Sequence, residues 1–499
     1  MEPVNKLINM RRILASCFVV SVIALTAALC CVSAFAADEL PPDIVLTEDT
    51  TIVNLSGGYN GIERQTIDTN GYTLTLLNTE DTEFVGTIIG SGDVIKTGSG
   101  SLKLSHLFKG VTTVFAEFQY TGKTYIQEGT LDLTVGQVLL SNTSQVINNS
   151  VIVTDKNQYF KNLSGTGTIN ASSGAMITLV NSGDSVFSGV INGEGTPVRV
   201  GGDGELTLSG ANTYTGGTTV INYQTSSSTA TNGHLKLTGS ALNYIGVMSV
   251  NGGKSVEFDV SGVKSYTITA ANKIEVKYGG EMIKSGDGTM QICCESAGLV
   301  SVDSMFISSG RIDYEGYFES TIGPGSSKTP TDCFVVEAGA TYSPGIGIGN
   351  TTFNNSNLTI RDNGIALFEF GAYNENPSQQ NYDTVTINNG PYRFVTSTNS
   401  IIELEFTNND AWKWAKEGAE YRIISAENGT FKSIAGDYSY LLGDYSEYFK
   451  LVGRDYDGYY LIGLGAPEPE PETAVSEPST WALMALGVVV LFLRKRVRN

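Results

Sequence analysis

The sequence of 499 residues contains little histidine and little cysteine, and both shortages limit its chemistry. Its 2 histidines, His106 and His234, lie at non-equivalent places beside alternating leucines, so paired histidine ligands and imidazole bases are not expected. Three of the 6 cysteines belong to an apolar N-terminal segment, which leaves Cys293, Cys294 and Cys333. An odd number excludes a pure disulfide framework. One pair and one buried thiol are expected, and the choice of pair stays open.

Long segments with an apolar period of 3.6 residues are also missing, which excludes a helical body. The 57 glycines follow no three-residue period, so they do not indicate collagen. An apolar fraction of 41% is enough for a core, which excludes a disordered chain. One segment, 411–420 (AWKWAKEGAE), predicts a short helix or cap. The abundance of glycine, threonine, serine and asparagine favours short strands joined by tight turns.

Positive charge is scarce, because 31 basic residues stand against 51 acidic ones and the net charge is −20. An acidic chain repels phosphate backbones, so nucleic acid is not an expected partner. The charge favours solubility outside the cell. Weak binding of divalent cations by a carboxylate-rich surface is the alternative.

The sequence does contain a glycine-spaced block that occurs twice. Residues 84–105 read FVGTIIGSGDVIKTGSGSLKLS, and residues 187–209 read FSGVINGEGTPVRVGGDGELTLS. A third, more divergent copy begins at 283–290, and its final strand is at 310–314. Such a unit cannot bury its apolar stripe alone and needs stacked neighbours. The repeat therefore predicts a solenoid.

Apolar and polar residues alternate through the body, as in the pairs Leu102 with Leu104 and Leu206 with Leu208. Because successive side chains of a strand face opposite ways, each short strand buries one aliphatic stripe. The threonine, serine, asparagine and lysine residues between them are expected to face water. The sequence thus predicts an all-β fold.

The N-terminus has the pattern of a secretory signal peptide. Basic residues precede an apolar stretch, 13–35, and small residues stand at Ala34 and Ala36, which predicts cleavage between Ala36 and Ala37. A lipoprotein box at 14–17 and a twin-arginine signal at 11–12 are the alternatives.

The C-terminus has three parts: an acidic linker at 467–472 (PEPEPE), an apolar run at 481–493, and a basic end. Thirteen apolar residues in a helix span about 20 Å, which is short of a bilayer core. This tail resembles the PEP-CTERM sorting signal of Gram-negative bacteria, although Ser476 replaces the first proline of that signal. The resemblance implies processing by an exosortase; an ordinary tail anchor is the alternative. The matching residues are Glu477, Pro478, Ser479, Trp481, Arg494, Lys495 and Arg496.

The repeats also resemble a known unit. The stretch 202–220 (GDGELTLSGANTYTGGTTV), and 90–105 with 120–133, are similar to the autotransporter-associated β-strand repeat of bacterial passenger domains. A later stretch, 337–434, resembles a passenger end. The resemblance implies a right-handed parallel β-helix. The family's membrane barrel is not expected here, because the sorting tail stands in its place.

These observations predict the following organisation. A signal peptide covers 1–36, and a β-helix covers 37–335 with repeats at about 84–133, 187–237 and 278–314. A passenger-like β segment covers 336–465, a Pro/Glu linker 466–477, and a short transmembrane sorting tail 476–499.

The sequence shows no motif that assigns a catalytic, cofactor-binding or metal-binding residue. The glycine-rich segments 345–349 and 201–205 are interpreted as turns. A tyrosine- and acid-rich segment, 437–460, is interpreted as a sheet that caps the stack, with sugar stacking as the alternative.

We therefore expect an exported, non-enzymatic surface or matrix scaffold, or adhesin, of a Gram-negative-type bacterium. Its expected partners are the export machinery, an exosortase-like enzyme, extracellular polysaccharide or host glycans, and the membrane through the tail before processing. A carbohydrate-active β-helix enzyme is the alternative, which requires acids from separate coils to meet in one groove.

Overall fold

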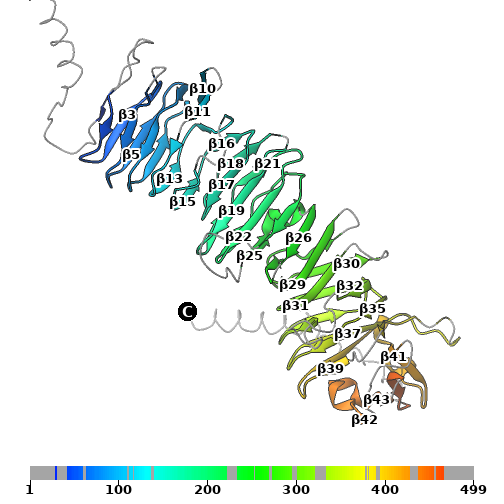
Figure 1. Ribbon diagram of the computed structural model, residues 1–499. Helices are drawn as coiled ribbons and strands as arrows, with labels where there is room; N and C mark the ends of the chain where they lie inside the picture. The colour runs from blue at the N-terminus through cyan, green and yellow to red at the C-terminus, as the bar shows by residue number, and fades with distance from the viewer. Residues whose placement is uncertain are drawn as a thin grey trace, which may run out of the picture. The chain divides into compact units, whose positions relative to one another are not determined.

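The computed structural model shows a chain built almost entirely of short β-strands (Figure 1). The residues that it describes are 29–30, 42–59, 63–109, 112–115, 117–135, 140–172, 174–221, 233–244, 246–251, 253–268, 272–294, 300–320, 333–376, 379, 381–388, 394–426, 436–454 and 457–465. The chain divides into two compact units, 1–246 and 247–499. In both units most strand pairs are parallel, so the predicted all-β, parallel β-helical fold is confirmed.

The first unit stacks its strands in parallel sheets along the axis of the helix. One sheet contains β1 (Leu29–Cys30), β3 (Thr50–Val53), β5 (Leu74–Leu77), β8 (Val94–Thr97), β13 (Lys123–Ile126) and β15 (Gln145–Asn148). A second contains β2 (Ile44–Val45), β4 (Thr66–Asp68), β7 (Thr87–Ile89) and β12 (Glu117–Phe118). A third contains β6 (Thr82–Phe84), β9 (Ser101–Leu104), β14 (Thr130–Asp132), β16 (Val151–Thr154), β18 (Thr168–Ala171) and β21 (Val190–Asn192).

The rest of the first unit continues the same stacking. One row contains β17 (Gln158–Lys161), β19 (Ile177–Asn181), β22 (Val198–Gly202) and β24 (Thr218–Val220). Another contains β20 (Ser185–Phe187), β23 (Glu205–Leu208) and β25 (His234–Thr238), followed by the 3-10 helix η1 (Gly239–Tyr244). The strands β10 (His106–Lys109) and β11 (Thr112–Phe115) form an antiparallel hairpin.

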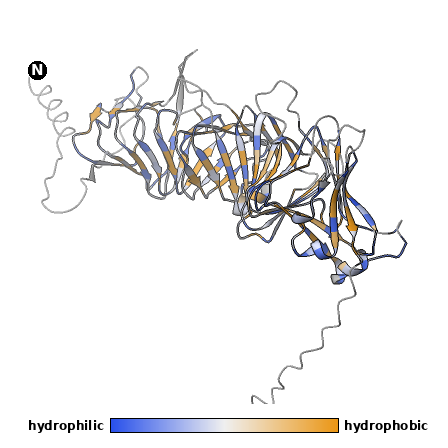
Figure 2. Cartoon of the chain, turned by 90° about the horizontal axis from the view of Figure 1, so that it is seen from below, coloured by the Kyte–Doolittle hydropathy of each residue, from blue (hydrophilic) through white to orange (hydrophobic). Residues whose placement is uncertain are grey.

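Inward-facing aliphatic ladders form the core of this unit. Parallel registers place Leu102 beside Leu131, and Leu131 beside Ile152. The ladder continues to Ile169 and Ile191, and all five residues are at most 2% exposed. Figure 2 shows this alternation of hydrophobic and hydrophilic residues along the strands. Burial of one such side chain contributes about 1.5–3 kcal/mol, so the stack is held by many equivalent contributions.

The repeated block folds twice into the same four strands, β6 to β9 and β20 to β23. Its Phe-x-Gly element has a packing cause, because the ring of Phe84 fills the space that a Cβ at Gly86 would need. The ring of Phe187 does the same at Gly189, and both phenylalanines are fully buried. A later glycine of the block turns the chain with a positive φ, and it does so in all three copies. These residues are Gly98 (φ 78°), Gly202 (φ 105°) and Gly286 (φ 79°).

Lys96 corrects the expectation that lysines between the aliphatic residues face water. It is 2% exposed and sits in an inward ladder, between Leu76 and Ile126 of the neighbouring strands. Its ammonium group donates to four backbone carbonyls at 2.9–3.1 Å, those of Thr97, Gly98, Gly100 and Glu128. Burial of a charge costs much less when its donors are satisfied, and here the turn supplies the acceptors.

The third copy of the block repeats this arrangement in the second unit. Lys284 is fully buried between Phe258 and Ile307. Its ammonium group donates to the carbonyls of Gly286, Gly288 and Ser309, each at 2.7 Å. The second copy has Val200 at the equivalent position, and there the amide of Asn181 donates to the Glu205 carbonyl at 3.0 Å. The corner of the coil is thus closed by a lysine or by an asparagine.

The second unit contains two parallel sheets. One is made of β26 (Val247–Asn251), β27 (Ser255–Asp259), β29 (Lys273–Ser285), β31 (Val300–Ile307), β33 (Phe334–Val336), β36 (Leu358–Ile360) and β39 (Phe394–Thr396). The other is made of β28 (Ser265–Ile268), β30 (Thr289–Cys294), β32 (Gly310–Glu319), β34 (Ala340–Ser343), β35 (Asn350–Asn354), β37 (Ile365–Phe370), β38 (Thr384–Asn388) and β40 (Ile401–Phe406). The described strands of both sheets pair in parallel.

An aromatic cluster adds to the aliphatic ladders in the interior of this unit, such as the buried ladder of Val250, Val276 and Val302. Phe334 lies at the centre of a cluster and makes edge contacts with Tyr314, Phe318, Tyr342 and Phe353 at centroid distances of 5.1–6.0 Å. All five residues are fully buried. Aromatic pairs with this geometry add about 0.5–1.5 kcal/mol each to the burial of their area.

The expected disulfide is not formed by the two cysteines whose side chains are described. Cys293 and Cys333 are both present as thiols. Cys293 lies in β30 and Cys333 directly precedes β33, and these strands belong to different sheets. Because a disulfide needs Cα atoms within about 7 Å, residues on separate sheets of the stack are poorly placed to pair.

The second unit ends in a cap of different construction. The helical pieces are η4 (Thr407–Asn409), α2 (Ala411–Trp414), η5 (Ser439–Leu441) and η6 (Gly443–Glu447). Of the segment 411–420, predicted as a short helix or cap, only 411–414 are helical, as the single turn of α2. The strands β41 (Glu420–Ala426), β44 (Gly458–Gly463), β43 (Phe449–Arg454) and β42 (Gly436–Asp437) pair in that order and antiparallel. We call these four strands with η5 and η6 the terminal sheet.

Candidate functional site

The terminal sheet has one aromatic face buried against the last coil. Its strands alternate, so Phe449 and Leu451 of β43 are buried while Lys450 is exposed. The ring of Phe449 stacks on Phe406 of β40 with a centroid distance of 5.7 Å and an angle of 4°. Tyr421 of β41 donates its hydroxyl hydrogen to the Trp414 carbonyl at 2.7 Å. This face closes the apolar interior of the second unit at its C-terminal end.

The outer face of the terminal sheet carries charges that neutralise one another. Arg422 lies 2.8 Å from Asp457, and Arg454 lies 2.5 Å from Glu420. Tyr460 donates its hydroxyl hydrogen to Asp457 at 2.7 Å, and the Arg454 guanidinium lies 4.2 Å from the centre of its ring. Exposed ion pairs contribute at most about 1 kcal/mol each, so this network mainly orders the side chains.

Two tyrosines stand out at the edge of this face. Tyr440 in η5 is 60% exposed, and its ring lies 6.3 Å from that of Tyr438, with an angle of 36°. Tyr438 is held from beneath by an edge contact with the buried Tyr459, at 5.2 Å. Its backbone N–H donates to the Leu451 carbonyl at 2.8 Å, which ties η5 to β43. The pair therefore presents aromatic surface from a fixed backbone.

The predicted tyrosine-rich segment thus has two roles. It forms a sheet that caps the stack, and it also places aromatic rings on the outside. Its tyrosines divide by burial, since Tyr459 is buried, Tyr438, Tyr445, Tyr448 and Tyr460 are half-buried, and Tyr440 is exposed. Tyr456 lies outside the described residues.

Acidic residues from separate coils meet elsewhere in the second unit. Arg311 of β32 pairs with Asp313 on its own strand, and its Nη2 atom lies 3.2 Å from Glu369 of β37. Asp383, just before β38, accepts hydrogen bonds from the backbone N–H groups of Gly349 at 2.7 Å and Glu369 at 2.8 Å. No sequence motif marks this cluster, because its members become neighbours only when the successive coils are stacked in their observed register.

The cluster is partly enclosed by protein, since the side chains of Arg311 and Glu369 are 28% and 18% exposed and its two aspartates are buried. Asp313 is 3% exposed and Asp383 is fully buried. The pKa of Asp383 is raised to about 7, chiefly by burial and in smaller part by the Glu369 carboxylate, whereas its two backbone hydrogen bonds and the charge of Arg311 act in the opposite direction. Within the described part of the chain, the Oε2 atom of Glu369 and the Oγ atom of Ser343 are buried without a hydrogen-bond partner. Chemically, the site can hold a proton at neutral pH, but its carboxyl groups face the fold.

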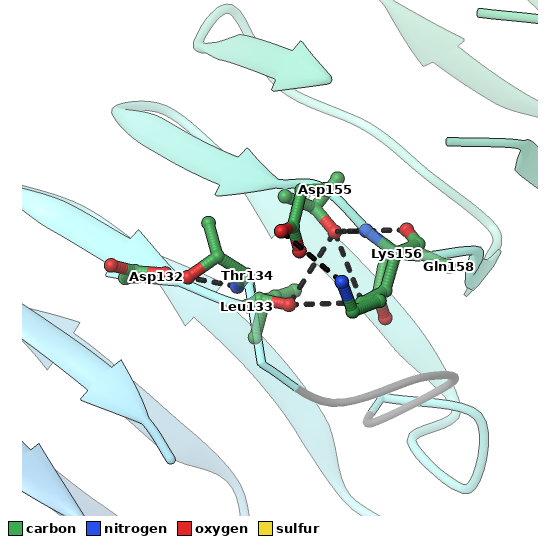
Figure 3. A network of polar contacts seen from close by, with 7 residues as sticks. Asp132, Leu133, Thr134, Asp155, Lys156 and Gln158 are labelled. Atoms are coloured by element: carbon green, nitrogen blue, oxygen red, sulfur yellow. Dashed lines mark hydrogen bonds and ion pairs between the residues drawn. The ribbon is translucent and has the colours of Figure 1, made fainter. Parts of the chain in front are cut away.

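Two acids on neighbouring coils of the first unit show the more common arrangement (Figure 3). Asp132 accepts hydrogen bonds from the backbone and hydroxyl of Thr134 at 2.9 and 2.6 Å. Asp155 pairs with Lys156 at 3.2 Å. Each carboxylate is bound by a local partner, which orders the corner of the coil.

The remaining sequence candidates belong to other strands and turns. His106 lies in β10, and His234 begins β25 with its ring 3.6 Å from the Glu205 carboxylate. The glycine-rich segment 345–349 forms a turn after β34, and 201–205 joins β22 to β23. Both glycine segments serve as turns, as predicted.

The predicted cleavage and sorting residues cannot be placed in the fold. Ala34, Ala36 and Ala37 lie outside the described residues, and so do Glu477, Pro478, Ser479, Trp481, Arg494, Lys495 and Arg496. Part of the predicted signal peptide is described, since β1 pairs in parallel with β3. Among the described residues, no helix is long and apolar enough to cross a membrane.

Comparison with known families identifies the tail. The model of the PEP-CTERM protein-sorting motif matches residues 474–496, which include every residue predicted for sorting. The motif indicates an exported protein that is sorted to the cell envelope by exosortase-type machinery. No curated protein matches the chain.

Proposed function

We propose that this protein is a non-enzymatic scaffold or adhesin, displayed at the bacterial surface or in the extracellular matrix, where it binds polysaccharide. The observation that carries the proposal is the sorting motif at 474–496, which follows a body of stacked parallel coils in the sequence. Such a body is stabilised coil by coil and presents a long, regular surface, which suits display outside the cell.

The repeats support a passenger-type architecture for this body. The four strands of the first block recur in the second, with the same buried phenylalanine and the same positive-φ glycine. These features agree with the resemblance to autotransporter-associated repeats. We propose that the sorting tail provides the envelope targeting that a membrane barrel provides in that family.

A carbohydrate-active enzyme is the second candidate, and the acidic cluster around Arg311 is the observation that favours it. Glycosidases need two carboxyl groups whose pKa values differ, and the pKa of Asp383 is raised to about 7 by burial while the neighbouring Glu369 pairs with Arg311. The full burial of Asp383 argues for a structural role, since a sugar must reach both carboxyl groups.

One experiment separates the two candidates. The protein, recovered from the surface of an exosortase-bearing host, is incubated with a panel of envelope and host glycans, and both binding and product release are measured. The scaffold proposal predicts binding without turnover. Sustained release of sugar products that is lost in the Glu369→Gln variant would overturn it in favour of the enzyme.

A further inference from the structure

We propose that Tyr438 and Tyr440 form a stacking subsite for the rings of a neutral polysaccharide. This inference rests on the proposed function and assigns it a place and a ligand class. The apolar face of an uncharged sugar ring is the surface that such a pair of phenol rings would cover.

Exposure and rigidity together distinguish this pair from ordinary surface tyrosines. Tyr440 leaves 60% of its surface in water, although the adjacent Tyr438 packs on the buried Tyr459. The backbone below it is fixed, because the Ser439 hydroxyl accepts a hydrogen bond from the Leu451 N–H at 3.1 Å and donates one to Asp437 at 2.5 Å. An exposed ring on a fixed backbone loses little conformational freedom when it binds a ligand.

The charge around the pair selects against acidic ligands. Lys450 of the neighbouring strand β43 is paired with Asp437 at 3.2 Å. The arginines of the same sheet are paired with Asp457 and Glu420. The segment that follows adds the carboxylates of Asp444 and Glu447, and the chain carries a net charge of −20. A polyuronate or a phosphate-bearing polymer would be repelled, whereas a neutral sugar would not.

The test uses the full chain exported by its host, with the Tyr440→Ala variant as the main change. Affinity electrophoresis measures retention in gels that contain a neutral β-glucan, galactan or mannan, or a polyuronate. We expect at least one neutral polymer to retain the wild type, and the variant to bind it about tenfold more weakly, which corresponds to about 1.4 kcal/mol. Tyr440→Phe keeps the ring and should bind like the wild type.

The matched control is Tyr317→Ala, because Tyr317 is also exposed, at 49%, and lies in the same unit away from η5. Thermal unfolding confirms that each variant is folded. If a neutral polymer binds and Tyr440→Ala binds as tightly as the wild type, the subsite is wrong while the proposed function stands. If none of the polymers binds, both fail. Preference for the polyuronate, or loss of binding to phospholipid vesicles in Tyr440→Ala, would also overturn the neutral-sugar subsite.

Discussion

Two buried lysines show how single residues control this fold. Lys96 and Lys284 each occupy an inward position of an alternating strand. The hydrogen bonds described for each ammonium group all go to backbone carbonyls. Burial lowers the pKa of both side chains to about 8. The alternation itself could have identified them, because Lys96 is in phase with Val94 and Lys284 with Met282, both of them buried.

Replacing Lys96 with methionine tests this role. The variant keeps an apolar stem but removes the ammonium donor from the carbonyls of Gly98 and Glu128, while those of Thr97 and Gly100 also accept backbone N–H groups. We therefore expect a loss of about 1–3 kcal/mol in the free energy of unfolding. Denaturant unfolding measures it, with the exposed Lys123 changed to methionine as the control. An unchanged midpoint in Lys96→Met would contradict the role.

The same lysine gives a pH dependence. Its pKa is about 8 in the fold and 10.5 ordinarily, so the unfolded chain binds more protons between these values and stability should rise with pH there. This rise should be smaller in Lys96→Met than in the wild type. Equal slopes in both proteins would show that Lys96 does not titrate in this range.

Asp383 should make the stability of the protein fall as the pH rises, in a lower pH range than that of Lys96. Burial raises its pKa to about 7 from 3.8, so its contribution to stability is fully present below pH 3.8 and is lost as the pH rises through 7. Asp383→Asn should flatten the fall in stability between pH 4 and pH 7, as measured by denaturant midpoints. The exposed Asp444→Asn variant is the control and should keep the slope of the wild type.

At the scale of elements, the strands are short and each coil depends on the close approach of its neighbours. Glycines make this approach possible at the turns, where a Cβ at Gly189 would overlap the Gly167 carbonyl of the preceding coil. The same Cβ would also overlap the ring of Phe187. The Phe-x-Gly element is therefore a unit of packing, and it explains why the repeated block begins with it.

Replacing a glycine with alanine tests whether the close approach of neighbouring coils limits the stability of the stack. Gly189→Ala should destabilise the protein by about 3 kcal/mol, because backbone and ring must both move. Gly183 has nothing within 4 Å of its Cβ position, so Gly183→Ala should change the stability by less than about 0.5 kcal/mol. Thermal unfolding measures both, and equal effects would mean that the close approach does not limit the stack.

The sequence carried enough information for the elements but not for every contact between them. Alternation and glycine spacing predicted the strands, and the alternating leucines 102 and 104 are both buried, as expected. The cluster of Arg311, Glu369 and Asp383 could not be predicted, because these residues are far apart in the chain and their meeting depends on the exact length of each coil.

At the scale of the whole molecule, the body and the tail have separate tasks. We propose that the coils and the terminal sheet form the part that is displayed, and the motif at 474–496 indicates sorting to the cell envelope. The net charge of the chain is −20, and basic residues follow the apolar run 481–493.

The most direct test of this account is the mass of the mature protein on the cell surface. Intact-mass spectrometry compares the surface form from an exosortase-bearing host with that from the same host lacking the enzyme. We expect the first form to lack the tail from Trp481 to Asn499 and the second to retain it. A surface form that keeps its complete C-terminus in the exosortase-bearing host would contradict the account.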